Sequence, residues 1–174
     1  MKKDKTLRLV MTALFAALTC VTTMTISIPI PATEGYVNVG DCVVLLGAFL
    51  LGPYCGTVSG ALGSALADLL LSYAVYAPGT AVVKGLMALI AALLFLRLRR
   101  RTRLASLLAS IAGELWMVFG YFLYESTVLG YGLGALGSVP ANLVQAAFGA
   151  LSATVLYRIL TAMPQFKQLQ SKEG

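Results

Sequence analysis

Four charged side chains interrupt long apolar runs of this sequence: Asp41, Asp68, Lys84 and Glu114. A charged group inside a bilayer costs several kcal/mol unless it is protonated, paired or facing water, so these residues are candidates for a polar site. The chain contains no histidine, which excludes serine-histidine catalysis and His-ligated metal centres. The acidic residues are not clustered as in a two-metal enzyme, and there is no nucleotide-binding glycine loop. The sequence therefore predicts a binding protein that is not an enzyme, without metal or cofactor.

The elements that must position these residues are membrane helices. Hydrophobic residues make up 59% of the 174 residues, charged residues only 11%, and the mean hydropathy is +0.85. Such a chain has too few polar side chains to cover a globule in water. Each crossing of a hydrocarbon core of about 30 Å takes roughly 20 residues, which leaves room for about six helices and no soluble domain. We predict an all-α integral membrane protein in which residues 1–174 form a single bundle.

The apolar runs and the turn residues between them place the helices. They are expected at residues 7–28, 37–52, 54–73, 80–96, 104–124 and 139–163. The connections contain proline, glycine or arginine, as in IPIPATEG, YAPG and RLRRRTR, which is typical of breaks between helices. The second helix is short and only Gly52 and Pro53 separate it from the third, so a tilted or re-entrant hairpin is the alternative for this segment.

Lysine and arginine are distributed unevenly along the chain. Of thirteen such residues, all but Lys84 lie before the first helix, after the fourth, or at the end of the sixth. These three regions share one side if the helices alternate, and cytoplasmic loops retain basic residues, so both termini are predicted to be cytoplasmic. The net charge of +6 is explained by this bias and by attraction to anionic membrane lipid, and a nucleic-acid partner is not expected.

The polar residues of several helices are expected at one depth. Asp68 and Lys84 should lie within roughly 6 to 9 Å of the outer surface, where an ion pair between them is natural. Asp41 begins the second helix at that level, and Asn142 and Gln145 begin the sixth. A purely structural alternative remains for these residues: the ion pair neutralises itself, Asp41 caps its own helix, and the amides join helices.

Glu114 is harder to explain by structure alone. It shares one face of the fifth helix with Tyr121 and Glu125, at spacings of seven and eleven residues, and this face runs from mid-membrane to the outer surface. No basic residue is predicted at the depth of Glu114. The preferred interpretation is a cavity reached from outside that holds a hydrogen-bonding ligand.

Small residues recur at four-residue spacing on two helices. The third helix has Gly56, Gly60 and Ser64, and the first has Ala13 and Ala17. Such stripes usually allow close helix packing within a bundle, although the first helix could also present its stripe to another protein.

Three stretches of the chain resemble a known transporter family. Residues 36–86, with the block GSALADLL followed by YAPGT and KGL, together with GELWMVFGYFLYE and PANLVQAAFGAL, resemble the substrate-binding S components of energy-coupling factor (ECF) vitamin transporters. The likeness covers essentially the whole chain and is closest to the hydroxymethylpyrimidine, pyridoxine and riboflavin group. It implies a multi-pass subunit of a prokaryotic plasma membrane that captures a vitamin outside. A coupling transmembrane subunit and two cytoplasmic ATPases would then drive import.

The resemblance also implies roles for particular residues. Family members dock their partner through an Ala-x-x-x-Ala stripe on the first helix, which Ala13 and Ala17 match, and they cover an outer pocket with the loop between helices one and two. We therefore expect substrate to be bound by the polar residues of the outer layer, of which the last two are as readily structural: Glu114, Tyr121, Asn142, Gln145, Lys84, Tyr36, Asp41 and Asp68.

The inventory of these side chains predicts the kind of ligand. Free cationic groups are scarce, which disfavours a phosphorylated vitamin. A neutral or weakly basic ring suits tyrosines and amides, with Glu114 accepting from a ring amine or hydroxyl, so hydroxymethylpyrimidine or unphosphorylated vitamin B6 ranks above riboflavin. The alternatives are a proton-coupled secondary transporter that uses Glu114 and a membrane scaffold subunit that does not transport.

Overall fold

The computed structural model describes residues 2–163 and is largely helical. Among these residues, five helices are long and apolar enough to cross a membrane, in agreement with the predicted helical membrane class. The helices are α1 (Lys2–Thr25), α2 (Asp41–Leu70), α3 (Ala77–Leu98), α4 (Ala105–Leu123) and α5 (Val139–Ala162). The connections hold strands β1 (Ser27–Ile30) and β2 (Gly35–Asn38), a π-turn η1 (Tyr124–Val128) and a 3-10 helix η2 (Gly132–Ser138).

Helix α2 combines the predicted second and third helices. Gly52 interrupts it with φ 79° and ψ −178°, a conformation open essentially to glycine alone, and the chain reverses there. The two arms pack against each other, since a Cβ on Gly56 would lie 2.7 Å from the Cα of Ala48 and one on Gly60 would lie 2.9 Å from Val44. The first arm is too short to cross a bilayer by itself. The segment therefore has the form of the hairpin alternative, and residues 2–163 contain five candidate spans in place of the predicted six.

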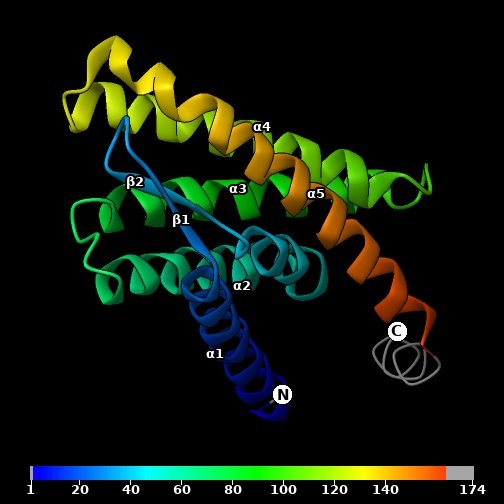
Figure 1. The fold of residues 1–174 in the computed structure, drawn as a ribbon. Helices are drawn as coiled ribbons and strands as arrows, with labels where there is room; N and C mark the ends of the chain where they lie inside the picture. The colour runs from blue at the N-terminus through cyan, green and yellow to red at the C-terminus, as the bar shows by residue number, and fades with distance from the viewer. Residues whose placement is uncertain (1, 164–174) are drawn as a thin grey trace.

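The connection between α1 and α2 is a β-hairpin that the sequence prediction missed. Ser27–Ile30 pairs antiparallel with Gly35–Asn38. The predicted helix is therefore wrong at residues 27–28 and 37–38, which form strands. Prolines in the stretch ISIPIP disfavour helix and push the residue before each of them into an extended conformation. β2 packs against α5 and α1, and Figure 1 shows the hairpin lying across the bundle.

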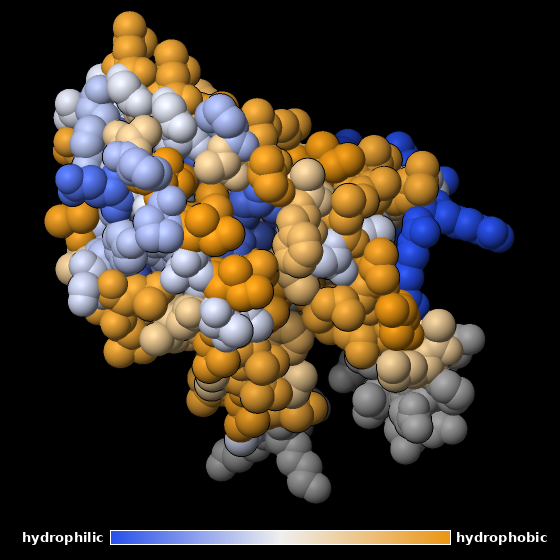
Figure 2. Space-filling model, viewed as in Figure 1, coloured by the Kyte–Doolittle hydropathy of each residue, from blue (hydrophilic) through white to orange (hydrophobic). Residues whose placement is uncertain are grey.

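The bundle has two distinct ends. In Figure 1 the hairpin tip and the α2–α3 turn lie at one end, with the α3–α4 connection at the other; we call these the hairpin end and the arginine end, because the second holds the run 99–103. Polar residues gather at both ends in Figure 2, with apolar surface between them. Exposed apolar side chains such as Val144 and Leu9, 72% and 70% exposed, suit contact with lipid.

The helices approach closely because alanine and glycine line their contacts. Ala88, Ala91 and Ala109 are fully buried between α3 and its neighbours. The stripe Gly56, Gly60 and Ser64 is buried within the bundle, as the packing interpretation predicted. Tight contacts of this kind fix the depth of each polar residue relative to the next helix.

Helix α1 packs mainly against α2. Phe15, Ala16 and Thr19 are buried there, whereas Ala13 and Ala17 are exposed. The alanine stripe thus does not pack inside the described bundle.

Candidate binding pocket

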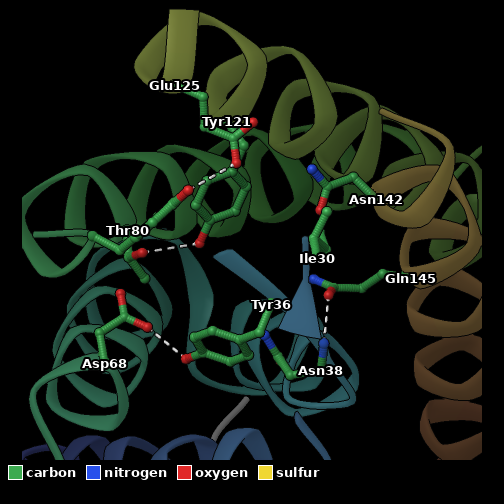
Figure 3. A pocket seen from close by; sticks show the side chains of 10 residues that line it. Ile30, Tyr36, Asn38, Asp68, Thr80, Tyr121, Glu125, Asn142 and Gln145 are labelled. Carbon is green, nitrogen blue, oxygen red and sulfur yellow. Dashed lines mark hydrogen bonds between the residues drawn. The ribbon is translucent and has the colours of Figure 1, made fainter. Parts of the chain in front are cut away.

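A narrow polar pocket lies at the hairpin end of the bundle. Side chains from the hairpin, α2, the start of α3, α4, η1 and α5 line it (Figure 3): Ile30, Tyr36, Asn38, Asp68, Tyr76, Thr80, Tyr121, Glu125, Asn142 and Gln145. All of these residues except Ile30 carry a polar group. The cavity volume is about 20 Å³, which is room for a water molecule. A ring compound can therefore bind only if lining side chains move.

Tyr36 of β2 closes the pocket from the hairpin side. Its hydroxyl donates to Asp68 Oδ1 at 2.5 Å (Figure 3), and its ring lies on Tyr73 with a centroid separation of 4.6 Å. Burial, reinforced by the charge of Asp68, raises the pKa of the Tyr36 phenol well above its usual range. The phenol therefore remains a hydrogen-bond donor at neutral pH.

A second tyrosine anchors the opposite wall. The Tyr76 hydroxyl donates to the carbonyl of Thr33 at 2.6 Å and lies 3.3 Å from Glu125 Oε1. Burial raises the pKa of Tyr76. Ser138 donates to Glu125 Oε2 at 2.5 Å, so both oxygens of this buried carboxyl group have partners. The wall is a closed hydrogen-bond network that ties the hairpin tip to η1 and η2.

Tyr121 separates the pocket from a buried lysine. Its hydroxyl donates to Thr80 Oγ1 at 3.1 Å, and the Lys84 ammonium lies 5.4 Å from the centre of its ring. At this separation the ring face attracts the cation. One face of Tyr121 is thus committed to Lys84.

Behind the pocket, Lys84 forms an ion pair with Asp41. Gln145 donates to Asp41 Oδ2 at 2.6 Å and accepts from the backbone N–H of Asn38 at 2.6 Å. A single glutamine therefore joins the ion pair to the hairpin. Asp41 follows the N-cap residue Gly40, and its two oxygens bond to Lys84 and Gln145, so the predicted capping role is wrong.

The predicted ion pair between Asp68 and Lys84 is also wrong. Helix α3 begins at Ala77, three residues before the predicted start, which places Lys84 about one turn deeper. At this depth Lys84 lies beside Asp41. The next residue, Gly85, accordingly packs against Ala61 in the middle of α2 and not against the end of that helix. Asp68 is buried at the hairpin end, where it accepts the hydrogen bond of Tyr36.

Glu114 of α4 lies beside this ion pair and is 2% exposed. Neither of its oxygens has a hydrogen-bond partner among the described residues. A Cβ on Gly149 would collide with its Oε1 and lie 3.0 Å from the Asp41 Cβ, so the two acidic side chains meet over this glycine. The expectation that no basic residue shares the depth of Glu114 is wrong, since Asp41, which meets it over Gly149, is ion-paired with Lys84.

The chain matches a protein-family model over residues 3–162, that of the ECF-type riboflavin transporter, S component. The chain belongs to this family. A Pyrococcus woesei protein described as "uncharacterized protein in gap 3'region" is 38% identical over 131 residues, which cover 75% of this chain and 86% of that protein. The family is one of transporter S components and not of enzymes.

The S-component pocket brings together some of the residues expected from the sequence and not others. Tyr36, Asp68, Tyr121, Asn142 and Gln145 line it. The other expected residues, Asp41, Lys84 and Glu114, are fully buried and lie outside its lining. Asp41 and Lys84 contact the lining residues Gln145 and Tyr121, respectively, and not the cavity itself.

Sequence reasoning missed several lining residues. Thr80 lies one turn before Lys84 on the same face of α3, and this spacing could have identified it. Asn38 and Tyr76 could not have been found in this way, because they depend on the hairpin and on the early start of α3. Among the described residues there is no cluster of His, Cys, Asp and Glu that could hold a metal ion.

Proposed function

We propose that this S component captures a small, neutral or weakly basic heterocyclic vitamin from outside the cell for import driven by partner ATPases. Membership of the family supports a vitamin-transport role. The observation that carries the proposal is the polar pocket beneath the hairpin, at the end of the bundle opposite the arginine run. With the arginine end in the cytoplasm, as the distribution of basic residues favours, the pocket opens outward.

The lining chemistry supports an uncharged ring. Asn142 and Gln145 offer amides, Asp68 and Glu125 offer carboxyl groups, and the tyrosines offer faces for stacking. No lysine or arginine lines the pocket within residues 2–163, and the nearby Lys84 is already paired with Asp41. A phosphate dianion would therefore meet carboxylates without a free cation, at a high desolvation cost.

The size of the pocket supports a single ring over three fused rings. The cavity of about 20 Å³ must enlarge for any vitamin, and Tyr36 and Asn38 of the hairpin strand β2 are only partly buried. A pyrimidine or pyridine needs a smaller displacement of these residues than a tricyclic ring does. Hydroxymethylpyrimidine or unphosphorylated vitamin B6 therefore ranks first. Riboflavin is the second candidate because the matching family is described by it.

The residues in contact with the ligand would be Tyr36, Tyr121, Asn142, Gln145 and Asp68. We propose that Glu114, Lys84 and Asp41 support the site from behind through Gln145. Substitution of Asn142 by Ala should then weaken ligand binding directly, because its amide is exposed to the pocket.

Calorimetry on the purified subunit in detergent tests the substrate class. Hydroxymethylpyrimidine, pyridoxine, pyridoxal phosphate and riboflavin are titrated in turn into the wild type and into Asn142→Ala. We expect tight binding of one of the first two, and weaker binding to the variant. Tightest binding of riboflavin would select the second candidate, and stronger binding of pyridoxal phosphate than of pyridoxine would reject the proposed pocket chemistry.

A further inference from the structure

The buried cluster behind the pocket contains an excess acidic group. Asp41, Lys84 and Glu114 are 1%, 1% and 2% exposed. If both carboxyl groups were ionised, the cluster would hold two negative charges and one positive charge. Every other lysine and arginine in the described range 5–163 is exposed, so none compensates the excess. A net buried charge of this kind is costly in a low-dielectric interior.

The neighbouring hydrogen-bond donors bond to Asp41 and not to Glu114. Lys84 and the Gln145 amide both donate to Asp41. Glu114 accepts no hydrogen bond within residues 2–163. A carboxylate that is 98% buried and has no donor is therefore the costly state, whereas a protonated carboxyl group can itself donate.

The partner for that donation is adjacent. Glu114 and Asp41 approach the same face of Gly149, where the absence of a side chain leaves them space. Each Asp41 oxygen that already accepts one hydrogen bond retains a second acceptor site. Two carboxylates that share a site do not both ionise readily, so one proton between them is the favourable arrangement.

We infer that Glu114 and Asp41 form a proton-binding site, in which one proton resides on Glu114 and is donated to the Asp41 carboxylate. Lys84 then balances the remaining charge and the cluster is neutral. The titratable groups that face Glu114 are Asp41 from α2 and Lys84 from α3; α5 contributes Gln145 and Gly149, which do not titrate. The proposed proton site does not require any particular vitamin. It is connected to the hairpin because Gln145 also accepts a hydrogen bond from the backbone N–H of Asn38.

Infrared spectroscopy of the purified protein at pH 7 tests this site without any ligand. A protonated carboxyl group has a C=O stretch separate from the bands of carboxylates. We expect this band in the wild type and its loss in Glu114→Gln, whose amide mimics the protonated acid. The band should also be lost in Asp41→Asn, because Glu114 then ionises to pair with Lys84. Glu125→Gln is the matched control and should retain the band.

Three results would overturn the site. An identical carboxyl region in the wild type and Glu114→Gln would show that Glu114 is ionised. A band that persists in Asp41→Asn would show that Glu114 is protonated without sharing its proton. Loss of the wild-type band when sodium replaces choline would assign the site to a metal cation.

Wild-type protein labelled with ¹³C in its glutamate carboxyl groups gives a readout that needs no variant. The carboxyl band should shift to the isotope-substituted position and disappear as the pH is raised. A band that does not shift with this label would belong to an aspartic acid and would reject Glu114 as the proton carrier.

Discussion

The membrane depth predicted from the sequence is correct for some of the polar residues and wrong for others. The sequence predicts that Asp68, Lys84 and Gln145 lie in one outer layer, and Asp68 and Gln145 do line one pocket. Lys84 pairs with Asp41 and not with Asp68, because an error of three residues in the predicted start of α3 moves Lys84 by about one helical turn. A pattern of charges therefore indicates that a polar site exists, while the partners depend on helix register.

Tyr36 provides a prediction at the same scale. Burial and Asp68 raise the pKa of its phenol in the folded protein, whereas an unfolded chain titrates near pH 10. Folding stability from this group is therefore complete below about pH 10 and is lost as the pH rises toward the folded-state value. We expect the melting temperature of the wild type to fall above about pH 10, and to fall less steeply in Tyr36→Phe.

Tyr54→Phe is the control for this measurement, because Tyr54 is 78% exposed and the substitution removes a phenol that folding does not bury. Equal alkaline slopes for the wild type and Tyr36→Phe would show that the Tyr36 phenol is not protected by folding.

At the scale of elements, the sequence predicted the long helices well and the connections poorly. α3, α4 and α5 begin and end within about three residues of prediction because their apolar runs are bounded by proline, glycine or arginine. The β-hairpin was missed because its apolar residues continue the hydrophobic runs on either side of it. Its conformation follows from strand pairing and contacts with α5, which no local pattern specifies.

The break in α2 predicts a specific sensitivity. Gly52 has φ 79°, which a residue with a Cβ adopts only with strain, so Gly52→Ala should destabilise the protein by about 1 to 3 kcal/mol. Gly134→Ala is the matched control, since its Cβ would meet nothing within 4 Å and its φ is not positive. Thermal unfolding in detergent measures both. Equal melting temperatures for the two variants would mean that the chain reverses at another residue.

Helix α1 supports a prediction about partner docking. Ala17 is exposed and Ala16 is buried against α2, so two neighbouring alanines test opposite faces of one helix. Ala17→Trp should abolish vitamin uptake in the complete transporter while leaving ligand binding to the purified subunit unchanged. Ala16→Trp should disrupt folding, because a Cβ on Gly63 already collides with the Ala16 carbonyl.

The two variants are compared by uptake into cells and by calorimetry. Unchanged uptake by Ala17→Trp would remove α1 as the docking face. Loss of ligand binding by the same variant would show that this stripe packs internally.

At the scale of the whole molecule, the family is one of transporter S components, and no nucleotide-binding glycine loop occurs in the sequence. We therefore predict that native membranes yield this subunit together with ATPases and a larger coupling subunit. Uptake should continue for a short time after a proton uncoupler is added, provided that ATP is maintained. Transport by this chain alone in liposomes, driven by a pH gradient, would instead identify a secondary transporter.

The pocket takes its side chains from the hairpin and from α2 to α5, and none from residues 5–25 of α1. The residues that would select the ligand are thus carried by one part of the chain, and the residues that would recognise the coupling subunit by another. Evolution can then alter the pocket without disturbing the docking helix. Chains that have diverged in cargo could keep a common α1 surface and compete for the same energising complex, so the abundance of each would set its share of import.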